Sequence, residues 1–153
     1  MSIILQDSHI KQINNKNIVL IGGCFDIIHP GHIQFLESSK KYGDILILLL
    51  ESDENIKKIK GESRPLNNQV TRAENLSKLE IVDYIILLKT PKSSNYYYNL
   101  VNLLRPAIIA VTVGDPLLEI KKDQAKIVGG KVVEVMERDT RHSSTEKIKN
   151  ISI

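Results

Sequence analysis

Five short apolar runs, separated by segments with helical periodicity, constrain the fold of this chain most strongly. Each run has five to seven residues and is rich in Ile, Leu and Val, which is typical of strands that are buried on both faces. The runs occupy residues 18–22, 45–50, 84–88, 107–113 and 131–135. Because strands and helices alternate, the sequence predicts an α/β fold with an open, parallel, five-stranded sheet and helices on both faces.

Apolar residues three positions apart predict helices between these runs. Val70, Ala73, Leu76 and Leu79 form one such stripe, in a helix over about 68–80. Further helices are expected at residues 33–40, around 100–104, at about 117–128 and from 143 onward. In sheets of this kind ligands bind beyond the carboxyl ends of the strands, so we expect the functional residues to follow those ends.

Length and composition favour one domain over residues 1–153, with 1–16 as an N-terminal extension and about 17–150 as the core. No apolar run approaches the roughly 18 residues of a membrane span, and the start lacks the pattern of a secretory signal. A single cysteine is typical of a reducing compartment, so we expect a cytoplasmic protein. The net charge of +3 is spread along the chain without a basic stripe, which argues against a nucleic-acid partner.

The stretch at residues 22–32, which joins the first predicted strand to a helix, reads Gly-Gly-Cys-Phe-Asp-Ile-Ile-His-Pro-Gly-His. A helix start gathers free backbone N–H groups at the positive end of its dipole and favours phosphate. His29 and His32 lie three residues apart, so both imidazoles can face the same side and donate to a nucleoside triphosphate. Beside phosphate we expect the pKa of both to rise. A capping or solvated histidine and a metal site are the alternatives, although no third ligand lies at suitable spacing.

Basic residues follow the second apolar run. Lys58, Lys60 and Arg64 lie on a segment that we expect to be flexible, where they either reach over bound phosphates or are solvated. Arg72 either binds the β- and γ-phosphates or lies on the polar face of its helix.

Two acidic residues and three tyrosines have both structural and functional interpretations. Asp26 either accepts backbone N–H groups that hold the turn or contacts the acceptor substrate. Asp115 follows Gly114 and a predicted strand. Its carboxylate either accepts a hydrogen bond from a hydroxyl of the ribose or of the acceptor substrate, or it has no role in the site. The tyrosines at 96–98 favour helix packing or the surface of a homodimer over a platform on which a nucleotide base stacks.

The first motif resembles that of the His-x-Gly-His nucleotidyltransferases, and the resemblance extends over about 17–150. It implies a Rossmann-like fold, a Mg²⁺-bound nucleotide, and transfer of a nucleotidyl group to a phosphorylated small molecule with release of pyrophosphate. In this reading His29 and His32 face the α-phosphate, and Lys60 and Arg72 stabilise the leaving pyrophosphate. The remaining expected nucleotide contacts are Gly23, Cys24, Phe25, Gly31, Gly114, Asp115, Ser143, Ser144 and Thr145.

The triplet Ser143-Ser144-Thr145 matches the family's second motif, which holds the triphosphate at the start of the last helix. An ordinary N-cap is the structural alternative for this triplet. Acceptor contacts are expected from Asp26, Lys58 and Arg64.

The middle of the chain resembles one branch of that family, the bacterial heptose-1-phosphate adenylyltransferases, in the stretch Lys60-Gly61-Glu62-Ser63-Arg64-Pro65-Leu66-Asn67. This implies ATP as the nucleotide and a sugar phosphate as the acceptor. Gly22, Thr112 and His142 depart from the pattern of that branch. The alternatives are ATP with FMN, CTP with a polyol or amino-alcohol phosphate, and a nucleotide-binding relative without turnover.

Overall fold

A computed structural model describes residues 2–6, 10, 13, 17–91, 93 and 95–137. The described residues form one six-stranded sheet in which every pair of neighbours is parallel, in the order β1-β4-β3-β2-β5-β6. The strands are β1 (Ile3–Gln6), β2 (Ile18–Gly23), β3 (Ile45–Leu50), β4 (Tyr84–Leu87), β5 (Ile108–Thr112) and β6 (Lys131–Met136). The α/β fold and the parallel sheet predicted from the apolar runs are thus confirmed.

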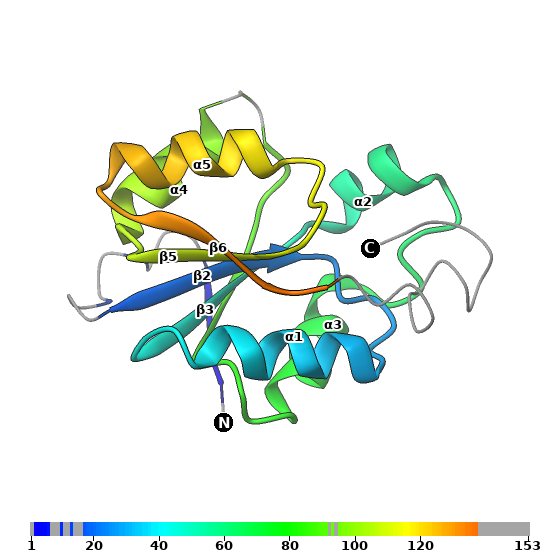
Figure 1. Cartoon of the computed structure of the whole chain (residues 1–153). Coiled ribbons are helices and arrows are strands. Elements are labelled where there is room, and N and C mark those ends of the chain that lie inside the picture. The colour runs from blue at the N-terminus through cyan, green and yellow to red at the C-terminus, as the bar shows by residue number, and fades with distance from the viewer. Residues whose placement is uncertain are drawn as a thin grey trace.

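Helices cover both faces of the sheet (Figure 1). Their bounds are α1 (Pro30–Lys40), α2 (Asp53–Lys60), α3 (Gln69–Ser77), α4 (Tyr96–Leu104) and α5 (Leu118–Ile127). Leu36 of α1 and Leu76 of α3 belong to one buried apolar cluster, and Leu100 of α4 and Ala125 of α5 belong to the other. Alternate strand residues supply the two clusters, because successive side chains of a strand point to opposite faces.

The strand order places a topological switch beside β2. The chain runs outward from β2 through β3 to β4, and then crosses back to add β5 on the other side of β2. Loops that leave the carboxyl ends of β2 and β5 therefore diverge to opposite faces, which is where open parallel sheets bind ligands. Helix α2 lies beyond this carboxyl edge rather than flat on either face (Figure 1).

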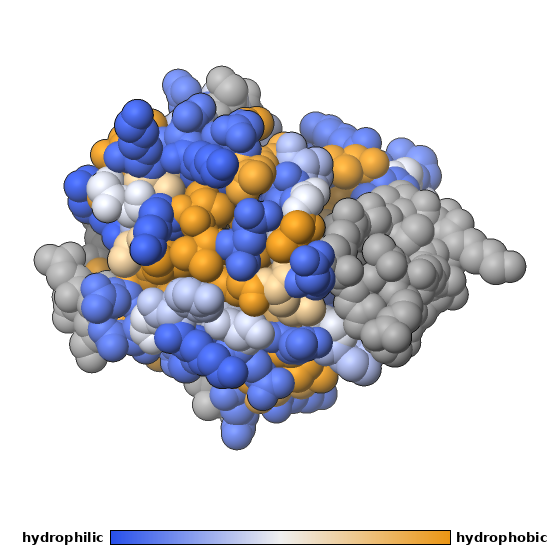
Figure 2. Space-filling view, in the orientation of Figure 1, coloured by the Kyte–Doolittle hydropathy of each residue, from blue (hydrophilic) through white to orange (hydrophobic). Residues whose placement is uncertain are grey.

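The first strand was not expected from the sequence. Ile3–Gln6 pairs with β4 at the edge of the sheet, so part of the segment assigned to an N-terminal extension belongs to the sheet. Ile3 and Ile4 are 52% and 40% exposed, which is why four residues gave no recognisable buried run. The opposite edge is β6, and Figure 2 shows apolar residues gathered there between the more polar surfaces of α5 and α1.

Helix α2 corrects the expectation of a flexible segment around Lys58 and Lys60. Ser52 caps it by accepting the N–H of Asn55 through its hydroxyl oxygen, at 3.1 Å. Only Ile56 and Lys60 are buried, so the helix has no apolar stripe that periodicity would detect.

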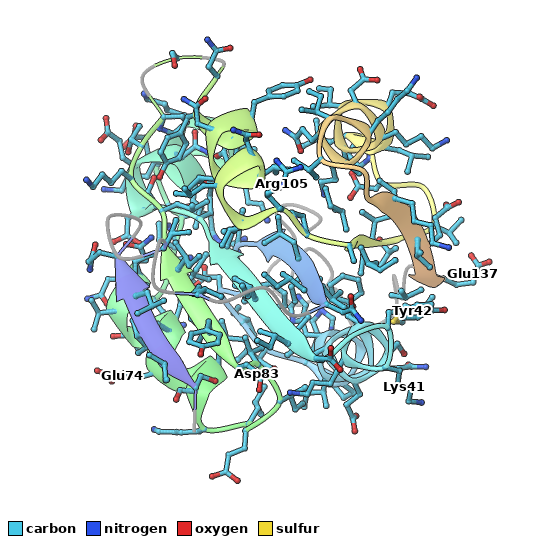
Figure 3. All side chains as sticks on the ribbon, turned by 90° about the vertical axis from the view of Figure 1, so that its left-hand side faces the viewer. Lys41, Tyr42, Glu74, Asp83, Arg105 and Glu137 are labelled. Atoms are coloured by element: carbon cyan, nitrogen blue, oxygen red, sulfur yellow. The ribbon has the colours of Figure 1, made fainter. Side chains whose placement is uncertain are left out.

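Charged groups also fix the end of the sheet remote from the switch. The Asp83 carboxylate, labelled in Figure 3, binds Lys40 at 2.6 Å and accepts the N–H of Leu46 at 2.8 Å. The predicted last helix, from 143 onward, lies outside the described residues. None of the helices in the described ranges is both long and apolar enough to cross a membrane.

Two positions on α3 test the packing of this helix. Leu76 is fully buried, whereas Val70, which the predicted stripe included, is 56% exposed and lies off the buried face. We expect Leu76→Ala to lower the free energy of unfolding by about 3 kcal/mol. The control Val70→Ala should change it by no more than about 0.5 kcal/mol. Urea unfolding followed by circular dichroism measures both, and equal losses would contradict the packing described.

Candidate active site

A tight turn carries the chain from β2 into α1. Phe25 has a φ of 49°, in the left-handed region, and its ring folds back under Gly23. A Cβ on Gly23 would lie 2.7 Å from Phe25 Cε2, so the position requires glycine. The Phe25 ring also contacts that of His32, with centroids 5.0 Å apart. The turn thus fixes the start of α1 directly beyond the carboxyl end of the central strand.

His29 and His32 cap α1 reciprocally. His29 Nδ1 accepts the backbone N–H groups of Gly31, at 3.1 Å, and His32, at 3.4 Å. His32 Nδ1 accepts the backbone N–H of His29 at 3.3 Å, and the two rings stack with centroids 3.8 Å apart. A ring nitrogen that accepts a hydrogen bond carries no proton, so each neutral imidazole bears its proton on Nε2. The caps therefore turn both histidines into Nε2–H donors.

Burial governs the protonation of His32 in the protein itself. Burial, and after it the nearby charges of His29 and Lys60, lower the pKa of His32 to about 3. His32 is only 5% exposed and lies beside another basic group, which disfavours its charged form. The rise expected beside bound phosphate stays a prediction. His32 offers a neutral N–H dipole rather than a positive charge.

Two buried cations lie at the same edge of the sheet. Lys60, the last residue of α2, is 8% exposed and Arg64 is 1% exposed. Burial lowers the pKa of Lys60, and the neighbouring Arg64 charge acts in the same direction, while the adjacent Cys24 thiol opposes both. Burial raises the pKa of the Cys24 thiol, and Lys60 counteracts this. Lys60, Arg64 and Cys24 are thus close enough to sense one another's charge.

Several of these buried donors lack an oxygen or nitrogen partner among the described residues, although Lys60 also interacts with the Cys24 thiol. Within the described part of the chain, no oxygen or nitrogen accepts from His32 Nε2, from Lys60 Nζ or from Nη1 and Nη2 of Arg64. A buried donor without an acceptor costs about 1–3 kcal/mol, and more when it is charged. Donors left in this way at one edge of the sheet favour an anionic ligand, whose oxygens would satisfy them.

Asp26 joins the first motif to the 61–68 segment. Its carboxylate accepts from Arg64 Nε at 3.1 Å and from the backbone N–H groups of Leu66 and Asn67 at 2.7 and 2.9 Å. Asn67 Nδ2 in turn donates to the Asp26 carbonyl at 2.9 Å. Asp26 is only 3% exposed, so the geometry favours the turn-holding interpretation over contact with an acceptor.

Arg72 is fully buried and holds three backbone segments together. Its guanidinium donates to the carbonyls of Asn67 at 3.0 Å, Cys24 at 2.8 Å and Glu51 at 2.9 Å, and to Asp53 at 2.7 Å. Four of its five N–H groups are therefore occupied by the protein. Arg72 therefore acts as a positioning residue, because it fixes the backbone of the turn that leads to the histidines.

The remaining expected residues are spread more widely. Lys58 has a 61% exposed side chain that pairs with Glu54 at 3.9 Å on the outer side of α2, away from the buried Lys60. Asp115 follows Gly114, whose φ is 83°, at the end of β5, and its carboxylate binds Lys121 and the N–H of Leu117, each at 2.7 Å. The triplet at 143–145 lies outside the described residues.

Sequence reasoning missed Glu51 and Tyr97 as a pair. Glu51 follows β3 directly, donates its N–H to the Gly23 carbonyl at 3.1 Å, and accepts from the Tyr97 hydroxyl at 3.0 and 3.1 Å. The carboxylate at the end of an apolar run was a usable signal, whereas nothing local linked it to a tyrosine on α4. Among the described residues, no group of three or more His, Cys, Asp or Glu side chains is placed to hold a metal ion.

The described geometry agrees with a family assignment. The model of the cytidylyltransferase-like family matches residues 20–152. The chain therefore belongs to the cytidylyltransferase-like family. It is a nucleotidyltransferase domain, as the resemblance of the first motif implied. The match begins within β2 and includes both histidines, so the site lies inside the family's domain.

Relatives of this cytidylyltransferase-like chain include longer proteins. It is 48% identical over 96 residues to the bifunctional protein HldE of Aliarcobacter butzleri, covering 61% of this chain and 19% of that protein. It is 37% identical over 145 residues to HldE of Geobacter sulfurreducens, covering 92% of this chain and 28% of that protein. The chain thus spans less than a third of the length of either relative.

Solved structures share the cytidylyltransferase-like fold of this chain. A lipopolysaccharide core biosynthesis protein from Thermoplasma volcanium matches with a TM-score of 0.64 and 26% identity, covering 82% of this chain and 98% of that one. A pantoate-beta-alanine ligase from Francisella tularensis matches with a TM-score of 0.67 and 16% identity, covering 97% and 73%. The second likeness concerns the fold alone.

The depressed pKa of His32 predicts how stability depends on pH. The unfolded chain takes up a proton at this residue below pH 6.5, whereas the folded protein does so only near pH 3. The free energy of unfolding therefore keeps the full contribution of neutral His32 above pH 6.5. It loses this contribution as the pH falls from 6.5 toward 3. Relative to His32→Asn, the wild type should lose up to about 1.4 kcal/mol per pH unit in this window. Parallel pH dependences in urea unfolding would contradict the assignment.

The Asp26–Arg64 pair predicts a large stability effect. Asp26→Asn leaves the buried Arg64 guanidinium without its counter-charge, so we expect the free energy of unfolding to fall by about 3–5 kcal/mol. The matched control is Glu119→Gln, because the Glu119 side chain is 84% exposed in its pair with Lys122. That control should cost no more than about 0.5 kcal/mol. A loss of similar size in both variants would show that Asp26 does not hold the turn.

Proposed function

We propose that this chain transfers AMP from ATP to a sugar phosphate such as heptose 1-phosphate, with release of pyrophosphate. The observation that carries the proposal is the set of buried donors without an oxygen or nitrogen partner among the described residues, on His32, Lys60 and Arg64, at the carboxyl edge of the sheet. The curated relatives named HldE, a heptose 7-phosphate kinase and heptose 1-phosphate adenylyltransferase, support adenylyl transfer to a heptose phosphate.

The reaction needs no covalent enzyme intermediate. A phosphate oxygen of the acceptor attacks the α-phosphorus of ATP, and the new P–O bond replaces the bond to the bridging oxygen of pyrophosphate. The electron pair of the broken bond leaves with pyrophosphate. The acceptor phosphate is already ionised at neutral pH, so alignment and charge stabilisation replace a general base.

The protein donors divide between the reacting groups. The Nε2–H groups of His29 and His32 point their dipoles at the α-phosphate and the bridging oxygen, where negative charge builds up. Lys60 and Arg64 supply full charges for the phosphates of the nucleotide or the acceptor. Arg72 acts through the Cys24 carbonyl that it holds. The hydroxyl triplet at 143–145 remains the proposed grip on the β- and γ-phosphates.

Magnesium enters this scheme with the nucleotide as part of the substrate. Mg²⁺ keeps several waters and binds readily through substrate phosphates, with one or two protein carboxylates at most.

Substrate choice is tested directly by pyrophosphate release. The purified chain is assayed with ATP, CTP, GTP and UTP against heptose 1-phosphate, glycerol phosphate, ethanolamine phosphate and FMN. We expect turnover with ATP and the heptose phosphate. Turnover confined to CTP would instead support the cytidylyl transfer that the family is named for. Turnover confined to FMN, or ATP binding without turnover, would overturn the proposal.

Two substitutions of His32 distinguish its role in capping helix α1, through Nδ1, from its role as a hydrogen-bond donor, through Nε2. The Asn side chain can accept the cap hydrogen bond but ends short of Nε2, whereas Gln places an N–H near the position of Nε2. We expect His32→Asn to fold and to lower kcat by about a hundredfold or more, as does the loss of a charge-stabilising donor. His32→Gln should recover part of that loss. Wild-type kcat in a folded His32→Asn at saturating substrates would contradict the role.

A further inference from the structure

Glu51 brings a carboxylate to the edge of the sheet where Lys60 and Arg64 lie. Within the described residues it pairs with no arginine or lysine, whereas the Asp26 and Asp53 carboxylates there pair with arginines. Glu51 is the first residue after β3, and its N–H donates to the carbonyl of Gly23, the last residue of β2. Arg72 Nη2 donates to the Glu51 carbonyl at 2.9 Å. The Glu51 carboxylate raises the pKa of the Cys24 thiol, while Lys60 lowers it, so the carboxylate and the ammonium flank the same thiol from the first motif.

The Glu51 carboxylate is oriented but not saturated. The Tyr97 hydroxyl donates one proton, shared between Oε1 at 3.1 Å and Oε2 at 3.0 Å, and the N–H of Ser52 reaches Oε1 at 3.3 Å. A carboxylate has about four lone-pair sites, so at least one, on Oε2, remains for another donor. Burial and the Glu51 charge both raise the pKa of Tyr97, which therefore stays protonated and continues to hold the carboxylate in place.

We propose that Glu51, held by Tyr97, binds hydroxyl groups of the acceptor sugar. The inference rests on the proposed function and assigns the hydroxyl-binding part of the same site. Phosphate oxygens are acceptors and carry negative charge, so a carboxylate repels them, whereas sugar hydroxyls are donors that a carboxylate binds well. Cations and neutral N–H groups thus take the phosphates, and Glu51 takes the polyol.

This division of charge also gives specificity. A buried or half-buried carboxylate that loses its hydroxyl partner keeps the cost of desolvation without the compensating hydrogen bond. A site built to bind a substrate hydroxyl therefore rejects an analogue that lacks it far more strongly than an apolar site rejects a missing methylene. Glu51 should accordingly discriminate between sugar phosphates that differ by one hydroxyl.

The experiment measures acceptor KM, ATP KM and kcat for the wild type and for Glu51→Gln, with heptose 1-phosphate and its monodeoxy analogues. We expect Glu51→Gln to raise acceptor KM about tenfold or more, as the loss of a charge-assisted hydrogen bond does, and to leave ATP KM unchanged. We also expect the wild type to reject at least one monodeoxy analogue by about tenfold or more, and the variant to lose that preference. A role in folding alone would not abolish the preference for one hydroxyl.

Matched controls lie close to Glu51 and Tyr97 in the sequence. Glu54→Gln removes a carboxylate on α2 that is 68% exposed and pairs with Lys58, and it should leave acceptor KM unchanged. Tyr97→Phe removes only the hydroxyl that orients Glu51 and should raise acceptor KM by a smaller factor than Glu51→Gln. Tyr98→Phe, on the next residue of α4, should have no effect. Thermal unfolding of each variant confirms that it is folded.

The outcomes separate this inference from the proposed function. Wild-type turnover with heptose 1-phosphate, together with unchanged acceptor KM and unchanged preference in Glu51→Gln, would overturn the inference and leave the function standing. If no sugar phosphate is a substrate of the wild type, both are overturned. If Glu51→Gln does not fold, the monodeoxy series on the wild type and Tyr97→Phe decides the question, and equal use of all analogues by both would overturn the inference.

Discussion

His29 and His32 cap helix α1 for each other, and the chemistry of the site depends on this exchange of hydrogen bonds. Each Nδ1 accepts a backbone N–H at the helix start, so each neutral ring carries its proton on Nε2. Helix caps are usually made by Ser, Thr, Asp or Asn, whose side chains end at the capping atom. An imidazole has a second nitrogen beyond it, which lets one residue both cap the helix and donate to a ligand.

The surrounding residues hold this start of α1 against the ends of neighbouring strands. Asp26 binds the backbone of the 61–68 segment, and Arg72 binds carbonyls at Cys24, Glu51 and Asn67. Both side chains are almost completely buried, so their charges act mainly to fix the backbone. Lys60 and Arg64 can then donate hydrogen bonds to anions, and the Glu51 carboxylate beyond β3 can accept hydrogen bonds from donor groups. The separation of charge at one edge follows from which polar atoms the protein itself leaves unpaired.

Local sequence patterns predicted most of the strands and helices and singled out His29 and His32. They did not predict the side-chain contacts that connect one segment to another. The apolar runs predicted five strands because parallel strands are buried on both faces, and they missed β1, which is short and half-exposed at an edge. Helix α2 was not predicted because it buries only Ile56 and Lys60 and so has no apolar stripe. The pairing of Glu51 with Tyr97 and of Asp26 with Arg64 depends on tertiary contacts, which a single sequence does not report. The low pKa of His32 in the protein itself likewise follows from burial, which a single sequence does not report.

The protonation sites of the two histidines are the most direct test of this account. Long-range ¹⁵N–¹H NMR spectra of the imidazole nitrogens, recorded at neutral pH with and without ATP and Mg²⁺, identify the protonated nitrogen of each ring. The account predicts neutral rings with the proton on Nε2 for both His29 and His32, and a change in the Nε2–H resonances when ATP binds. A proton on Nδ1 in either ring, or Nε2–H resonances that do not respond to saturating ATP, would contradict it.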